Sequence, residues 1–120
     1  MHFAKVIFST AALSLAVTAP AAAEFKRIKN EKQMLQLVAG KKLVSDAGYS
    51  FIYADGTLKG KFNGQNFSGS WLWSGRFWCR NGVLGGQEIG SDCQVWEIDG
   101  DKLRYTRKKG KGDAVVATLE

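Results

Sequence analysis

The residues most suited to binding chemistry lie in one short stretch of the chain, G-S-W-L-W-S-G-R-F-W-C-R. Counting by twos places Trp71, Trp73 and Phe77 on the inner face of a hairpin, where aromatic rings usually pack a sheet. Trp78 and Arg80 then point outward. An outward tryptophan beside an arginine indicates either packing against a helix or contact with a partner. We therefore take Trp73, Trp78 and Arg80 as candidate binding residues.

A second candidate segment is the basic stretch from Lys102 to Asp113, K-L-R-Y-T-R-K-K-G-K-G-D. Its Gly-Lys-Gly tip could offer backbone N–H and ammonium groups to an anionic polymer or a lipid headgroup. The alternative, which we favour, is a solubilising hairpin whose lysines prevent strand addition at an edge. For the binding interpretation the candidate residues are Tyr105, Arg107, Lys109 and Lys111.

The acidic residues give little support for catalysis. Those in the Asp-Gly turns have a structural explanation. Glu88 and Asp92 could form a glycosidase-like pair in a glycine-rich loop, but acids at this spacing are common in loops. Strict alternation points Glu97 inward, and there we expect a position at the barrel rim or a salt bridge with Arg107 rather than a buried catalytic acid.

The chain also lacks the motifs of common enzyme classes. No dinucleotide fingerprint, Walker phosphate loop, nucleophile elbow or Cys-x-x-Cys pair occurs. The one histidine, His2, lies in a predicted signal peptide, so the processed chain would have no imidazole for acid–base chemistry or zinc ligation. We therefore predict a non-enzymatic protein without a cofactor or a bound metal.

The first 23 residues have the pattern of a secretory signal peptide. A basic start at Lys5 precedes an apolar centre from Val6 to Val17, and small residues end the segment at Ala23. Cleavage after Ala23 would remove 23 of the 120 residues and leave 97, with 16 Lys and Arg against 11 Asp and Glu. A chain of this length forms one domain, residues 24–120, with a modest core. We expect it in the periplasm or secreted, without a transmembrane segment after processing.

Two cysteines in an exported chain favour a disulfide bond, because oxidising compartments form and keep such bonds. Cys79 and Cys93 would close a loop of about 15 residues, which contributes about 3 kcal/mol in the chain-entropy model. Alternation places both of them on the inner face of the predicted sheet. The competing interpretation is a pair of buried free thiols.

The elements that position these residues are mainly strands. Residues Asn30 to Val38 predict a short amphipathic helix with Asn30 as N-cap, Gln33 as capping-box partner and Gly40 past its end. Beyond this helix apolar and polar residues alternate, and Asp-Gly or Asn-Gly dipeptides mark tight hairpins. The predicted strands are 42–45, 50–54, 57–62, 65–73, 76–80, 93–98, 102–107 and 114–119. They predict a mainly β fold, a small antiparallel meander rolled into a barrel-like sheet of about eight strands with one short N-terminal helix.

Alternation also predicts which residues fill that barrel. The expected inner positions are Leu58, Gly60, Phe62, Phe67, Gly69, Trp71, Trp73, Phe77, Cys79, Cys93, Val95, Leu103, Tyr105, Val115, Ala117 and Leu119. The expected solvent positions are Lys59, Lys61, Ser68, Ser70, Arg80, Gln94, Lys102, Arg104 and Thr106. Only residues 81–92 remain as an irregular loop.

Several motifs resemble those of a group of small exported bacterial proteins of unknown function: Asp55-Gly56, Gly60, Gly69-x-Trp71-x-Trp73, Cys79-Arg80, Cys93 and a basic strand like 104–107. The resemblance covers most of residues 24–120 and implies no catalytic residue. Some members carry the label dihydrodipicolinate reductase, which these residues do not support because the nucleotide fingerprint is absent. Gly69-Ser70-Trp71 is also similar to the G-x-W motif of lipocalin-like barrels, including small periplasmic inhibitor barrels.

These observations predict an exported binding or inhibitor-like domain that acts through its surface aromatic and basic hairpins in the cell envelope. The alternative is a carrier that holds a small apolar ligand inside the β-roll near Trp71, Trp73 and Tyr105, provided that inward rings do not fill the interior. An uncharacterised enzyme is a third hypothesis. The partner is unknown; an envelope protein or an anionic polymer suits the basic surface, whereas no nucleic-acid motif is present. We expect a monomer.

Overall fold

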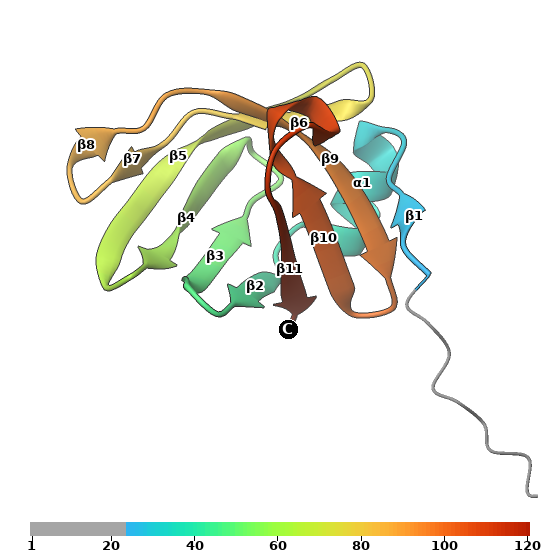
Figure 1. The fold of residues 1–120 in the computed structure, drawn as a ribbon, viewed down its shortest axis with the longest axis horizontal. Coiled ribbons are helices and arrows are strands. Elements are labelled where there is room, and N and C mark those ends of the chain that lie inside the picture. Colours follow the sequence, from blue (N-terminus) through green and yellow to red (C-terminus); the bar gives the residue numbers. More distant parts are fainter. Residues whose placement is uncertain (1–23) are drawn as a thin grey trace, which may run out of the picture.

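A computed structural model of the chain describes residues 24–120 (Figure 1). The predicted signal peptide, residues 1–23, lies outside the described residues. Strands predominate, and one short helix, α1 (Glu31–Val38), stands near the start of the described chain. No helix in this part of the chain is long and apolar enough to cross a membrane.

Eight antiparallel strands close into a barrel, which confirms the predicted barrel-like sheet of about eight strands. Around the ring they are β9 (Asp92–Asp99), β10 (Lys102–Thr106), β11 (Ala114–Leu119), β2 (Lys42–Ser45), β3 (Gly48–Ile52), β4 (Thr57–Phe62), β5 (Gln65–Ser74) and β6 (Phe77–Arg80). Strand β6 pairs with both β5 and β9, and this double pairing closes the ring. Each strand lies within two residues of its predicted bounds. Closure satisfies the backbone groups that an open sheet would leave exposed at its edges.

Three short strands and a tight turn extend the barrel. Strand β1 (Lys26–Arg27) pairs with β9, and β7 (Val83–Leu84) with β8 (Gln87–Glu88) forms a small hairpin within the segment expected to be irregular. Strand β7 continues β6 along β5 in one register, since Trp71 lies opposite Arg80 and Phe67 opposite Leu84. The turn α2 (Arg107–Gly110) joins β10 to β11.

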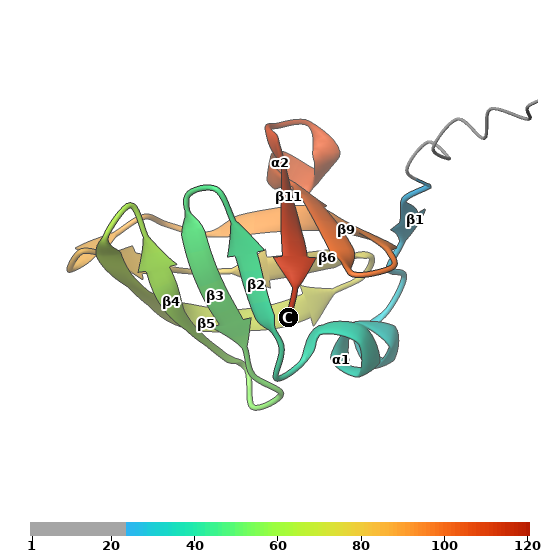
Figure 2. The ribbon, with the colours of Figure 1, turned by 90° about the horizontal axis from the view of Figure 1, so that it is seen from below.

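Helix α1 begins at the predicted N-cap. The Asn30 side chain accepts a hydrogen bond from the Gln33 backbone N–H at 2.9 Å, and the Gln33 side chain accepts one from the Lys29 N–H at 2.9 Å. These bonds satisfy donors that a helix start leaves unpaired. Met34 and Val38 are fully buried, and Figure 2 shows α1 beside one end of the barrel.

The turn between β5 and β6 decides which side chains enter the barrel. It has two residues, Gly75-Arg76, so Ser74 lies opposite Phe77 and Trp73 opposite Trp78. Opposed residues share a face of the sheet, and the inward series therefore passes from odd numbers on β5 to even numbers on β6. The predicted faces of β6 and β9 are wrong, because simple alternation carried the odd series across this turn. The inward residues are Trp78, Arg80, Gln94 and Trp96, and the outward residues are Phe77, Cys79, Cys93 and Val95.

The predicted disulfide is confirmed, but on the outer face of the barrel. Cys79 and Cys93 lie directly opposite each other on β6 and β9, with their sulfur atoms 2.07 Å apart. The bond therefore links the two strands whose pairing closes the ring.

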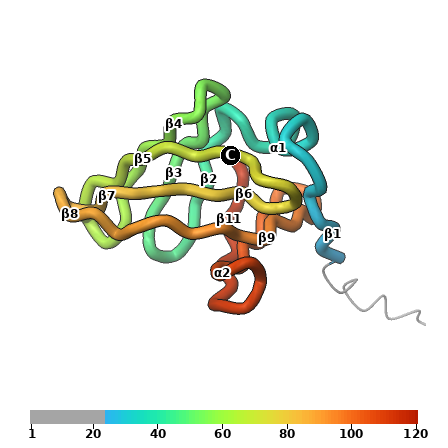
Figure 3. Tube along the Cα trace, turned by 90° about the horizontal axis from the view of Figure 1, so that it is seen from above, coloured from blue at the N-terminus to red at the C-terminus, as the bar shows by residue number. Residues whose placement is uncertain are grey.

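The antiparallel order gives the barrel two unlike ends. Helix α1 and the turns 53–56, 75–76 and 100–101 lie at one end, which we call the helix end. The turns 46–47 and 63–64, the segment 81–91 and the turn α2 lie at the other, which we call the open end. Figure 3 shows the β7/β8 hairpin extending from the barrel on the side away from α1.

Candidate functional site

The interior of the barrel contains a cavity of about 760 Å³, a volume within the usual range of small-molecule sites. Its apolar wall includes Ile52, Leu58 and Trp96. Exposed residues of the turns at the open end, among them Ala47 and Asn63, also line it, so the cavity reaches solvent there.

The other half of the interior is filled. We call the buried residues that do not line the cavity the packed core: Ile28, Met34, Val38, Trp71, Leu103, Ala117 and Leu119. Helix α1 contributes two of them, and its side chains take up space that would otherwise extend the hollow. The helix therefore closes one side of the interior and leaves the open end as the route to the cavity.

Trp78 and Arg80 line this cavity, which corrects their predicted position on the surface. The two residues alternate on β6 and so project to the same inward face. Trp78 is 3% exposed and stacks on Trp96, with ring centres 4.3 Å apart. Leu72 of the same hairpin points outward and is 58% exposed.

The four tryptophans of the chain all lie in the described part, and their indole N–H groups differ. Trp71 donates to the Tyr53 carbonyl at 2.8 Å, Trp73 to the Gly75 carbonyl at 2.8 Å, and Trp96 to the Gln94 side chain at 3.0 Å. The buried Nε1 of Trp78 has no partner among residues 24–120. Among the four indoles, the one without a hydrogen-bond acceptor thus belongs to Trp78, a residue that lines the cavity.

Arg80 carries a second unused donor. Its Nη1 is buried without a hydrogen-bond partner, and its guanidinium lies 5.8 Å from the centre of the Phe67 ring. Burial lowers the pKa of Arg80, while the negative charge of Asp92 acts in the opposite direction. Arginine nevertheless stays protonated in proteins, so a partly desolvated cation faces the cavity.

The carboxylate nearest to Arg80 on β9, that of Asp92, already accepts hydrogen bonds from other groups. Asp92 accepts from the Gln94 side chain at 3.0 Å and, through its other oxygen, from the Lys108 backbone N–H at 3.0 Å. Within residues 24–120, the one ion pair shorter than 4.0 Å joins Arg104 to Glu97. The negative charge of Asp92 therefore stabilises the positive charge of Arg80 through space, but the two side chains form no ion pair within 4.0 Å.

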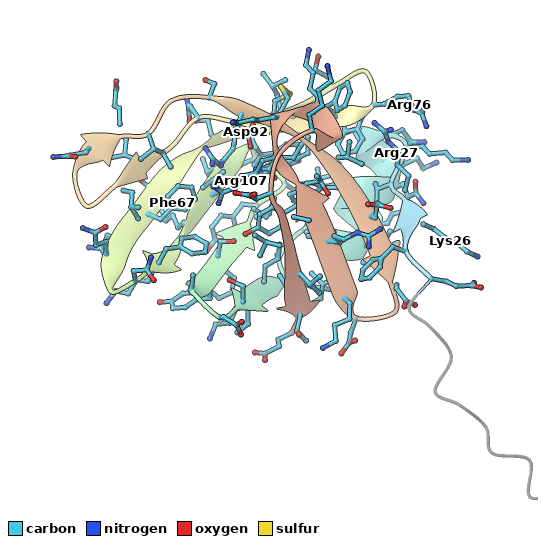
Figure 4. The ribbon with its side chains drawn as sticks, viewed as in Figure 1. Lys26, Arg27, Phe67, Arg76, Asp92 and Arg107 are labelled. Atoms are coloured by element: carbon cyan, nitrogen blue, oxygen red, sulfur yellow. A yellow bond between two sulfur atoms is a disulfide. The ribbon has the colours of Figure 1, made fainter. Side chains whose placement is uncertain are left out.

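The candidate binding residues Tyr105, on β10, and Arg107, at the start of α2, also line the cavity. Burial raises the pKa of Tyr105, and the positive charges of Arg107 and Arg80 partly oppose this rise. The phenol is therefore neutral at physiological pH and keeps its O–H as a donor. Figure 4 shows Arg107 and Phe67 over the barrel, whereas Arg27 and Arg76 lie near α1.

The remaining predicted site residues lie elsewhere. Trp73 points inward but does not line the cavity, and Lys109 and Lys111 are exposed at the tip of the basic hairpin. Lys108 and Lys109 adopt left-handed backbone conformations there, with φ of 53° and 55°. The ammonium of Lys109 lies 5.7 Å from the centre of the Phe77 ring.

Two predictions about acidic residues are resolved. Glu97 points outward and pairs with Arg104 at 2.9 Å, so the expected partner Arg107 and the inward position are both wrong. Glu88 is exposed on β8, whereas Asp92 is half-buried and accepts the two hydrogen bonds described above. No group of three or more possible metal ligands occurs in residues 24–120.

Sequence reasoning missed several cavity residues. Gln94 is 2% exposed and faces inward, although alternation assigned it to the solvent face. Ser50, Leu84 and Ile89 also line the cavity. The length of the Gly75-Arg76 turn was the signal that would have placed Gln94 correctly, because a two-residue turn changes the parity of the inward series.

Comparison of the chain with protein-family models, with curated proteins and with solved structures finds no match in any of the three. The resemblance to small exported domains, and the weaker one to lipocalin-like barrels, therefore stay predictions. The fold and the cavity define the class: a small closed β-barrel with an internal pocket.

Proposed function

We propose that the protein is an exported, non-enzymatic carrier that holds a small, largely apolar molecule inside its barrel. The observation that carries this proposal is the cavity of about 760 Å³. Apolar walls with a few convergent polar groups are typical of ligand sites. A filled interior would have argued against a carrier.

The cost of such a cavity supports this interpretation. Protein interiors are normally close-packed, and side chains that line a void lose the dispersion contacts that neighbouring atoms would provide. A domain of about 100 residues has a small free energy of unfolding, and a large cavity lowers it further. A bound ligand would restore dispersion contacts to the side chains that line the cavity, which explains why such a cavity could be retained.

The surface-hairpin hypothesis has less support. Two of its residues, Trp78 and Arg80, face the cavity rather than solvent. Lys109 and Lys111 remain exposed, and an interaction of this tip with an envelope protein or an anionic polymer stays a prediction. The Cys79–Cys93 disulfide supports an extracytoplasmic location, because oxidising compartments maintain such bonds.

Paired native and denaturing mass spectra of protein purified from the periplasm test the proposal first. We expect the native ion to be heavier by a small molecule that denaturation releases. The denatured mass checks the predicted cleavage after Ala23 and the disulfide at the same time. If the native ion carries no ligand, binding of decanoate, 1-decanol, decyl phosphate and decyltrimethylammonium should be measured by titration calorimetry; failure of all four to bind would contradict the carrier function.

A matched pair of substitutions locates the site. Ser50 is buried and lines the cavity, whereas Ser68 is exposed on the outer face of β5. We expect Ser50→Phe to fill part of the cavity and to weaken binding by roughly tenfold or more, while Ser68→Phe leaves binding unchanged. Equal effects of the two changes would place the ligand outside the barrel.

A further inference from the structure

Trp78 and Arg80 both line the cavity, and each has one buried donor atom without an acceptor among residues 24–120, Nε1 in Trp78 and Nη1 in Arg80. Both belong to β6, and their side chains enter the cavity from the same face of this strand. The other three indole N–H groups, those of Trp71, Trp73 and Trp96, all have acceptors, so the unpaired N–H of Trp78 is an exception in this barrel.

Unused buried donors are rare because they are costly. More than nine in ten buried polar groups in proteins are hydrogen-bonded, and an unpaired one costs roughly 1–3 kcal/mol. The third such atom in residues 24–120 is Arg27 Nε, but that guanidinium does donate through Nη2 to the Arg76 carbonyl at 2.9 Å. The guanidinium of Arg80 forms no ion pair within 4.0 Å among these residues, and its buried Nη1 has no acceptor.

The charges around the cavity favour a negative group. Arg80 and Arg107 both line it, and Tyr105 adds a neutral phenol. Two carboxylates lie in the same region: Asp92, whose two oxygens already accept hydrogen bonds, and Asp46, which is exposed in the turn 46–47. Neither lies within 4.0 Å of a cationic nitrogen of Arg80 or Arg107.

On the basis of the proposed carrier function, we infer that the ligand is an apolar molecule with an anionic oxygen head group, a carboxylate in the simplest case. The head group lies beside Arg80 and Trp78, whose side chains shift to donate hydrogen bonds to it, and the apolar part lies against Ile52, Leu58 and Trp96. Charge-assisted hydrogen bonds in a low-dielectric site are the strongest that a side chain makes, so this head group determines the specificity of the cavity.

The test compares head groups on one tail. Titration calorimetry of the wild-type protein with decanoate, 1-decanol, decyl phosphate and decyltrimethylammonium keeps the apolar part constant and varies only the head group. We expect decanoate to bind roughly tenfold or more tightly than 1-decanol, and the cationic amphiphile to bind least. Tighter binding of decyl phosphate than of decanoate would keep the anionic head group and identify it as a phosphate monoester.

Substitutions assign the preference to the two donors. Arg80→Met removes the guanidinium but keeps a long side chain, and we expect it to abolish the preference for decanoate over 1-decanol. Arg104→Met removes an arginine on the outer face and should leave the preference intact. Trp78→Phe keeps a ring to stack on Trp96 but removes the N–H, and it should reduce the preference severalfold.

The outcomes separate the two proposals. Equal affinity of the wild-type protein for decanoate and 1-decanol overturns the anionic head group and leaves the carrier function standing. Failure of every amphiphile to bind contradicts the carrier function itself. A preference for decanoate that survives in folded Arg80→Met overturns the role of Arg80. If this variant does not fold, the wild-type comparison and Trp78→Phe still decide the inference.

Discussion

Tryptophan and arginine occur both in the cavity wall and elsewhere in the barrel, but their hydrogen bonding differs between these places. In the packed core the indole of Trp71 donates to the Tyr53 carbonyl, and on the outer face Arg104 pairs with Glu97 through two hydrogen bonds. In the cavity wall Trp78 and Arg80 each bury a donor with no acceptor among residues 24–120. The difference separates a region in which these polar groups are paired from one in which two donors are not, and under the proposed carrier function the second region would bind the ligand.

The largest expected effect compares two buried leucines, one in each region. Leu103 is 0% exposed in the packed core, and Leu58 is 1% exposed in the cavity wall. We expect Leu103→Ala to lower the free energy of unfolding by about 3–5 kcal/mol and Leu58→Ala by about 2 kcal/mol, because the space left by Leu58 would join a cavity that already reaches solvent, whereas the space left by Leu103 would be enclosed. Urea denaturation measures both; equal losses would contradict the distinction between the two regions.

The second effect concerns the bond that closes the ring. Replacing Cys79 and Cys93 by alanine should lower the free energy of unfolding by about 3 kcal/mol, since the loop between them is no longer constrained in the unfolded chain. Denaturation of the variant and of the wild-type protein with and without reductant checks the value. The variant should not respond to reductant, and an unchanged wild-type stability under reducing conditions would argue against this contribution.

The third prediction compares the effects of replacing Arg80 and Arg104 on the free energy of unfolding. In the absence of ligand, Arg80→Met should raise the free energy of unfolding by about 1 kcal/mol, because it removes a desolvated charge without a partner. Arg104→Met should lower it by about 0.5 kcal/mol through the loss of a partly exposed ion pair with Glu97. Denaturation of the ligand-free variants gives both signs. A loss of stability in Arg80→Met would show that this arginine supports the fold.

The smallest expected effect is the pH response of a turn at the helix end. Hydrogen bonds from the Thr57 hydroxyl and backbone N–H lower the pKa of Asp55 below its usual value. A carboxyl with a lowered pKa in the folded state stabilises the fold above its unfolded-state pKa, and this contribution is lost as the pH falls through the folded-state value. Thermal melting across the acid range should therefore show a slightly weaker loss of stability in Asp55→Asn than in the wild-type protein, and parallel curves would refute the link.

Local patterns predicted the elements with good accuracy. The Asn30 cap, the glycine-containing turn dipeptides and the alternation beyond residue 40 predicted the helix and all eight barrel strands. These signals are local: a cap or a tight turn depends on a few neighbouring residues and their backbone angles. The pairing of Cys79 with Cys93 was equally accessible, because the chain has no other cysteine.

The site was harder to predict for a physical reason. Trp73, Trp78, Arg80, Tyr105 and Arg107 were all named as candidates, but the structure brings four of them to the cavity wall and leaves Trp73 outside it. A shift of one residue moves every side chain of a strand to the opposite face of the sheet. The two-residue turn before β6 introduces such a shift, and the predicted faces of Trp78, Arg80 and Gln94 were therefore all wrong. Ser50 and Ile89 join the wall from distant parts of the chain, and no local pattern indicates such a meeting.

The sequence by itself determined the class of fold, the helix, the strands and the disulfide, since capping, turn chemistry and period-two alternation act over a few residues. Only the tertiary structure decided that the barrel closes, that α1 adds Met34 and Val38 to the packed core, and that a cavity remains in the rest of the interior. Closure depends on the register of β6 against both β5 and β9, and a cavity depends on the summed volumes of side chains from many strands. The sequence named Trp78 and Arg80 as candidate binding residues on the surface, and these two conditions moved them to the cavity wall.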